Sequence, residues 1–101
     1  MASETKIERD VADWWESMSP EGAHYLHIKI VIWGRAGWPD HIFIGPNGRL
    51  KWIEFKKPGE EPTVLQRHIH HLLRQLGQDV EVHDNKESAI GSLARMLDSA
   101  H

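Results

Sequence analysis

The sequence contains no cysteine and has no excess of basic residues. Without cysteine, a disulfide scaffold, a cysteine-ligated zinc finger and a thiol nucleophile are excluded. The 12 Lys and Arg against 15 Asp and Glu give a net charge of −3. This balance argues against a protein that binds nucleic acid indiscriminately through a polybasic surface. It is compatible with an enzyme that places carboxylates around a metal ion, because the cation reverses the local field.

Long apolar runs are also missing. No stretch approaches the roughly 20 apolar residues of a membrane-spanning helix. The first ten residues, MASETKIERD, lack the apolar segment of a signal peptide. We therefore expect a cytosolic protein without a membrane partner. The 101 residues allow one domain, 1–101, and a hydrophobic fraction of 40% is too high for a disordered chain.

Two kinds of apolar periodicity predict the secondary structure. Helical spacing predicts helices over 4–18, 63–76 and 86–98. Alternation, with β-branched and aromatic residues, predicts strands over 24–33, 40–45, 50–57 and 80–82. Asn47-Gly48 is typical of a hairpin turn between two of these strands. The order α-β-β-β-α-β-α predicts an α/β fold, with a mixed central sheet flanked by helices.

Polar residues at the helix ends support these boundaries. Ser3 and Asp84 are expected N-caps of the first and last helices. The middle helix has two possible starts, a capping box of Thr63 and Gln66, or Glu61 as the cap followed by Pro62. Its apolar face is expected to point inward with Leu65, Ile69, Leu72, Leu73 and Leu76, and Gly77 is expected to end it in a left-handed conformation.

The strand over 50–57 carries the most informative polar residues. Side chains alternate between faces, so Glu54 and Lys56 share one face of the sheet. The hairpin brings Asp40, at the start of the preceding strand, toward the same end. Two carboxylates and an ammonium at one spot are costly without a partner, and a hard divalent cation such as Mg²⁺ is a suitable one. The alternative from this pair alone is an ordinary surface salt bridge.

A longer pattern surrounds these residues. Pro39-Asp40 and Glu54-Phe55-Lys56 resemble the signature of the PD-(D/E)XK nuclease superfamily. The strings GRAGWPD (34–40), IEFKKPG (53–59) and PTVLQ (62–66) are similar to its VRR-NUC (virus-type replication-repair nuclease) branch. The resemblance covers nearly the whole chain, from about Glu4 to the last helix, and implies a restriction-endonuclease-like core. Trp38 departs from the pattern, because it is bulky where the family often has a small or aliphatic residue.

The resemblance implies metal-dependent cleavage of phosphodiester bonds in DNA. It implies that Asp40, Glu54 and the backbone carbonyl of Phe55 hold Mg²⁺ or Mn²⁺. Glu8, preferred over Glu4 as the helical carboxylate, would ligate through water or complete a second site. Stand-alone, phage-encoded members of this size tend to act as homodimers on branched DNA such as four-way junctions. The host-cell cytoplasm is then the expected location.

Two further side chains are assigned to catalysis by the same resemblance. Lys56 would position the attacking water. Gln66 would orient water, Lys56 or phosphate, although the capping box explains it equally without catalysis. Candidate phosphate contacts are Lys29, Arg35, Lys51, Lys57 and Arg67. Trp38 either stacks on an unpaired base or closes a dimer interface.

Some features have plainer interpretations. His68, His70 and His71 lack a further ligand for zinc, so we expect a solvated or phosphate-facing helix edge. Trp33, with Trp14 or Trp15, is expected in the core or an interface. Three alternatives to a junction endonuclease stay open: a nuclease-like module that binds DNA without cutting, a monomeric flap or single-strand nuclease, and a structural domain that binds protein through exposed Trp.

Overall fold

The computed structural model describes residues 2–31 and 36–99. The elements are α1 (Glu4–Ser17), β1 (Leu26–Lys29), β2 (His41–Ile44), a short 3₁₀ turn η1 (Pro46–Gly48), β3 (Leu50–Phe55), α2 (Val64–Gln75), β4 (Val80–His83) and α3 (Lys86–Ser99). The predicted order α-β-β-β-α-β-α is therefore confirmed. No helix within these ranges is long and apolar enough to cross a membrane.

The four strands form one mixed sheet in the order β1-β2-β3-β4. β1–β2 and β2–β3 are antiparallel, whereas β4 runs parallel to β3. The hairpin turn lies where it was predicted, with positive φ angles at Asn47 and Gly48. The parallel pair needs a crossover connection, and α2 supplies it. The first strand is shorter than the predicted 24–33, because its pairing with β2 ends at Lys29 opposite His41.

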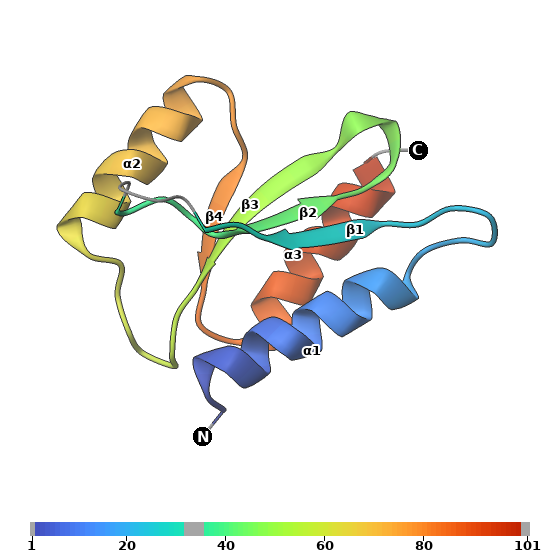
Figure 1. Ribbon diagram of the computed structural model, residues 1–101, viewed down its shortest axis with the longest axis horizontal. Helices are drawn as coiled ribbons and strands as arrows, with labels where there is room; N and C mark the ends of the chain where they lie inside the picture. Colours follow the sequence, from blue (N-terminus) through green and yellow to red (C-terminus); the bar gives the residue numbers. More distant parts are fainter. Residues whose placement is uncertain (1, 32–35, 100–101) are drawn as a thin grey trace.

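The main core lies between one face of the sheet and the pair α1 and α3, which run side by side (Figure 1). Trp15 is fully buried there and packs edge-on against Phe43, with ring centroids 5.9 Å apart. Its indole N–H donates to the Leu26 carbonyl at 3.0 Å and so ties α1 to β1. The other fully or largely buried members are Ile7, Val11, Ile53, Phe55, Ala89, Leu93, Met96 and Leu97.

The middle helix, α2, lies apart from α1 and α3 (Figure 1). The Thr63–Gln66 capping box is present, so the alternative start at Glu61 was wrong. At the other end, Gly77 has the predicted positive φ of 84°. The prediction that the whole apolar face points inward was wrong: Leu73 is buried, but Leu76 is 79% exposed. The reason is that α2 packs mainly against the edge strand β4, which covers only part of that face.

The N-terminal cap of α3 also differs from the prediction. The backbone N–H of Ser88 donates to Asn85 Oδ1 at 2.8 Å, so Asn85 rather than Asp84 caps the helix. Asp84 instead accepts a hydrogen bond from the backbone N–H of Gly59 at 2.9 Å. This hydrogen bond lowers the pKa of Asp84 and ties the loop before α2 to the start of α3.

Candidate active site

The end of the β2–β3 pair positions the two carboxylates of the Pro-Asp and Glu-x-Lys motifs. The antiparallel register pairs His41 with Ile53. Continued by one residue, it places Asp40 opposite Glu54, and directly opposite residues share a face of the sheet. The backbone N–H of Ile30 donates to the Asp40 carbonyl at 2.6 Å, which holds Asp40 in line with β1 as well.

Glu54 is buried, and its Oε1 has no hydrogen-bond partner within the described ranges. His70 of α2 approaches it: its Nε2 lies 3.8 Å from Glu54 Oε1 and is equally unpaired in this part of the chain. The prediction of a solvated edge was therefore wrong for His70, while His68 and His71 are exposed as expected. The sequence feature that could have predicted the burial of His70 is its spacing to Leu73, because residues three apart share one face of a helix.

Lys56 follows Glu54 by two residues and is buried. Its Nζ lies 3.8 Å from Glu60 Oε1, so this ammonium has a carboxylate neighbour in the loop before α2. A buried ammonium beside a carboxylate pair is a suitable group to hold an anion or a water molecule. The carbonyl of Phe55 lies in the backbone between Glu54 and Lys56.

Two carboxylates of α1 approach the site from the other side. Glu8 Oε1 lies 3.2 Å from Nε2 of the buried His41, and Glu8 Oε2 lies 3.4 Å from Lys29 Nζ. Glu4, one turn earlier, has a raised pKa, caused first by burial and then by the negative charges of Glu8 and Glu60. Glu54 raises and Lys56 lowers that pKa, so both α1 carboxylates belong to the electrostatic environment of the site.

The loop before β2 is fixed by a close approach to α2. Gly37 has φ of +89°, and a Cβ on it would lie 2.8 Å from Leu65 Cγ. Glycine is therefore required both by the backbone angle and by space. The next residues are held too: Trp38 packs on Trp52 with centroids 6.1 Å apart, and Pro39 is buried. The packing of residues 37–39 therefore fixes the position of Asp40.

The remaining predicted residues have contacts of their own. Gln66 uses its amide oxygen to accept from the backbone N–H of Thr63 at 2.9 Å, which is the capping role. Lys57 and Arg67 are exposed, and Arg67 lies 3.8 Å from Glu61. The predictions for Arg35 and Trp33 lie outside the described residues.

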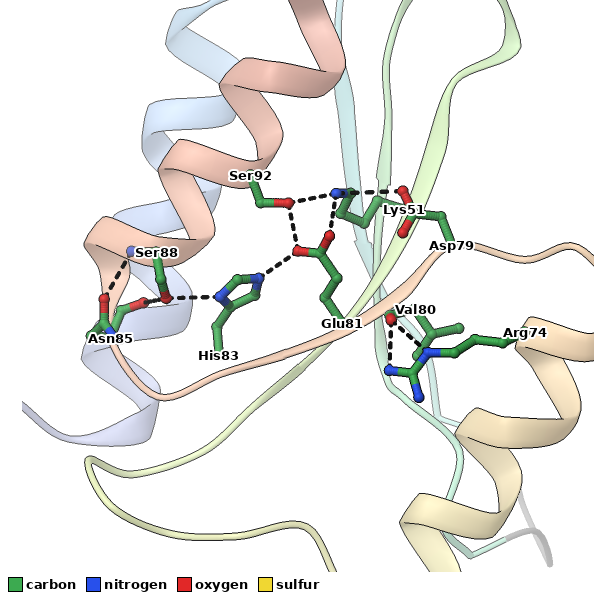
Figure 2. A network of polar contacts seen from close by, with 9 residues as sticks. All are labelled: Lys51, Arg74, Asp79, Val80, Glu81, His83, Asn85, Ser88 and Ser92. Atoms are coloured by element: carbon green, nitrogen blue, oxygen red, sulfur yellow. Dashed lines mark hydrogen bonds and ion pairs between the residues drawn. The ribbon is translucent and has the colours of Figure 1, made fainter. Parts of the chain in front are cut away.

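One candidate phosphate contact, Lys51, is excluded by its position. It is buried on the opposite face, where its Nζ donates to Glu81 Oε2 at 2.7 Å and to Ser92 Oγ at 2.5 Å (Figure 2). Glu81 Oε1 also lies 2.7 Å from His83 Nε2. Burial alone would raise the pKa of Glu81, but the hydrogen bonds from Lys51, Ser92 and His83 lower it to about 2. This network fastens β3 and β4 to α3 and has a structural role.

The donor set fits a hard divalent cation that keeps part of its water shell. No group of three or more His, Cys, Asp and Glu side chains in the described ranges has the arrangement of a complete metal site. Mg²⁺ typically uses one or two protein carboxylates, with water and substrate phosphate as its other ligands. Asp40 and Glu54 meet that requirement, and the unpaired Oε1 of Glu54 is an oxygen that still needs a partner.

Comparisons with known proteins find one curated relative and several solved structures that are similar to this chain. A curated relative is 42% identical over 62 residues, which make up 61% of this chain and 67% of the relative. It is described as "Putative nuclease p44" of Acyrthosiphon pisum secondary endosymbiont phage 1. No family model matches the chain.

Two solved structures share the fold. One, described as "VRR_NUC domain", has a TM-score of 0.77 at 24% identity and covers 93% of this chain and 97% of its own. The other, "VRR_NUC domain protein", has a TM-score of 0.81 at 19% identity and covers 96% and 89%. The predicted fold class, a mixed sheet flanked by helices, is therefore confirmed.

Proposed function

This chain belongs to the VRR-NUC nuclease family, and from that membership we propose that it is a divalent-metal-dependent endonuclease that hydrolyses phosphodiester bonds in branched DNA. The nuclease domain spans residues 1–101. Four-way junctions are the proposed substrate, and a phage-encoded protein of this kind acts in the cytoplasm of the host cell. The observation that carries the proposal is the buried, unpaired Glu54 Oε1 in the register position next to Asp40.

The metal site is assigned to the end of the β2–β3 pair. Asp40, Glu54 and the backbone carbonyl of Phe55 would hold Mg²⁺ or Mn²⁺, with Glu8 contributing through water. A bound divalent cation supplies Lewis-acid polarisation of the phosphate and acidifies a coordinated water. Asp40 supports this role because its side chain is 38% exposed, which leaves it accessible from solvent.

Lys56 and Gln66 are assigned to the nucleophile and the phosphate. The Lys56 ammonium, on the same face of β3 as Glu54, would orient the attacking water and stabilise negative charge that develops on phosphate. The amide oxygen of Gln66 already accepts from the backbone N–H of Thr63. Its NH₂ group is therefore the part that would donate to phosphate or water.

The DNA surface is assigned to the exposed cations near this end of the sheet. Lys57 follows the Glu-x-Lys motif directly, and Arg67 lies on the first turns of α2. Both would neutralise phosphates, and Arg35, which lies outside the described residues, is proposed for the same role. Trp38 would border the surface from its position against Trp52.

A homodimer is the proposed assembly, because one face of β1 is apolar and open to solvent. His27 points toward Phe43 in the core, so its neighbours Leu26 and Ile28 face the other way. They are 51% and 43% exposed. A two-fold axis through this face would bury them and present two metal sites to two strands of a junction.

Cleavage of a defined DNA panel tests the proposal. Labelled single-stranded, duplex, flap and four-way DNA are incubated with Mg²⁺, Mn²⁺ or EDTA, with Glu54→Gln as the matched control. We expect paired nicks in the four-way junction with either metal, and none with EDTA or the variant. Binding of the junction without cleavage in Mn²⁺ would favour a DNA-binding module, and cleavage of flaps alone would favour a monomeric flap nuclease.

A further inference from the structure

His41 connects the two acidic motifs that come from different parts of the chain. It opens β2 directly after Asp40 and is 1% exposed. Its Nε2 lies 3.2 Å from Glu8 Oε1 and 3.5 Å from Asp40 Oδ1. Within the described residues, no other ion-pair contact of Asp40 is seen. The imidazole therefore stands between the carboxylate of α1 and the aspartate of the Pro-Asp motif.

The other ring nitrogen of His41 is engaged by a second histidine. His27 Nε2 lies 2.8 Å from His41 Nδ1, which is a hydrogen-bond distance. Burial, followed by the effect of His41, lowers the pKa of His27. A neutral imidazole has one N–H to donate, and the 2.8 Å contact places it between the two rings. Phe55 packs edge-on against the His41 ring at 5.0 Å and restricts its rotation.

These contacts favour one tautomer of His41. A neutral imidazole carries its proton on one nitrogen and a lone pair on the other. With the proton on Nδ1, the Nε2 lone pair would lie within 3.5 Å of two carboxylate oxygens, which is repulsive. With the proton on Nε2, the Nδ1 of His41 accepts from the Nε2–H of His27. The buried Nε2–H then has no hydrogen bond of good geometry within the described residues, and it lies within 3.5 Å of both Glu8 and Asp40, either of which a small movement would bring into a hydrogen bond.

We propose that His41 is a positioning residue that holds Glu8 and Asp40 in one fixed arrangement through a shared Nε2–H, with His27 setting its tautomer. Two carboxylates that face one cation repel each other until it binds, and a donor between them lowers that cost. Donors behind metal-binding carboxylates orient those ligands in the same way. This role rests on the proposed metal-dependent nuclease, because the arrangement serves a cation held by Asp40.

His41 also contacts three segments that are distant in the sequence. Glu8 lies on α1, Asp40 lies before β2, and His27 lies on β1. The proposed role therefore implies that a change at any of the three affects the other two through the one buried ring. By contrast, a histidine that only filled space beside Phe55 would tolerate an apolar side chain of similar volume.

Two measurements test the role of His41. The first is a ring-nitrogen NMR spectrum of the wild-type protein, which is expected to show His41 protonated at Nε2. The second is Mn²⁺ affinity without DNA, measured by calorimetry for wild type, His41→Gln and His41→Leu, with thermal unfolding of each. His41→Leu removes the donor, and we expect about tenfold or greater loss of Mn²⁺ affinity. His41→Gln keeps a donor near the Nε2 position and is expected to retain most of the affinity.

The outcomes separate this proposal from the proposed function. If the wild-type protein does not bind Mn²⁺, the metal-dependent function fails. If it binds Mn²⁺ and a folded His41→Leu variant binds it equally well, only the positioning role is overturned. Protonation at Nδ1 would also overturn it, and this spectrum decides the question even where the leucine variant does not fold. Loss in both variants would show that the amide does not replace the imidazole and would contradict a simple donor role.

Discussion

His70 Nε2 and Glu54 Oε1 face each other across 3.8 Å, and neither atom has a hydrogen-bond partner in the described part of the chain. A buried polar group without a partner costs about 1–3 kcal/mol. If these side chains served stability alone, we would expect an apolar residue in place of Glu54 or His70, or a hydrogen bond between them. We infer that the site at Glu54 is kept for its chemistry and that the fold stabilises it from elsewhere, mainly through the apolar layer around Trp15.

Glu54→Gln is expected to separate activity from stability. Loss of the negative ligand should reduce single-turnover cleavage about 10²-fold or more, in line with several kcal/mol of metal-derived stabilisation. Without metal, the melting temperature should stay equal or rise, because the change removes a buried carboxyl group whose Oε1 has no hydrogen-bond partner within the described residues. Glu87→Gln, a change at an exposed position in the first turn of α3, is the control. Full activity of Glu54→Gln in Mn²⁺ would refute the assignment.

Two variants of Lys56 distinguish its possible roles. Arg keeps the positive charge but cannot release a proton near neutral pH, and its planar head places its donors differently. If Lys56 orients or deprotonates the attacking water, Lys56→Arg should be nearly as slow as Lys56→Ala. If it only supplies positive charge to phosphate, Arg should restore much of the rate. Single-turnover rates of both variants decide this, with the exposed Lys86→Ala as the charge-loss control.

Gly37→Ala should damage both the fold and the site. An added Cβ meets Leu65 at 2.8 Å, and the residue has φ of +89°. Gly22 has a similar φ of +82° with nothing within 4 Å, so Gly22→Ala reports the backbone strain alone. We expect Gly37→Ala to lower the free energy of unfolding by about 1–3 kcal/mol more than Gly22→Ala, because of overpacking. Denaturant unfolding measures both variants. Equal losses in the free energy of unfolding would contradict the prediction, because they would show that α2 moves to accommodate the added Cβ without a loss of stability.

Local patterns predicted most of the fold. Apolar periodicity gave the right order of elements, and Asn47-Gly48 marked the turn because positive φ is needed there. The exposed face of α2 was missed because helical spacing shows that a helix is amphipathic but not how much of its face a partner covers. The short β1 was missed for a similar reason, since β2 limits its pairing.

Only those residues of the candidate site that belong to a sequence motif could be predicted. Asp40 and Glu54 follow from the hairpin register, which alternation and turn position determine. His70 and His41 depend on tertiary packing, because each becomes a site residue only when another element places a carboxylate within 4 Å of it. Lys51 shows the opposite error: as a charged residue it was expected at the surface, yet Glu81 holds it inside.

Acid should weaken the network around Glu81 in a defined pH range. The pKa of this carboxyl falls from 4.5 to about 2 on folding. Its stabilisation is therefore complete above pH 4.5 and is lost as the pH falls toward 2. The shift sets an upper limit of about 3 kcal/mol on the contribution of this carboxylate to the free energy of unfolding. Solvent screening reduces that contribution, because the side chain is partly exposed. Urea unfolding of wild type and Glu81→Gln at several pH values checks this, and their difference should shrink over that range. An unchanged difference would contradict it.

The last prediction concerns the assembly. If the open face of β1 is the dimer interface, light scattering at micromolar concentration should give twice the chain mass of 11.7 kDa. Ile28→Lys places a charge on that face and should shift the mass to that of the monomer, because burying an unpaired ammonium in an apolar interface is costly. Leu76→Lys adds the same charge at an apolar residue that is 79% exposed at the C-cap of α2, and should leave the mass doubled. A wild-type monomer would refute the dimer and move the substrate from four-way junctions to flaps. The chemistry assigned to Asp40 and Glu54 would stand, because both lie within one chain.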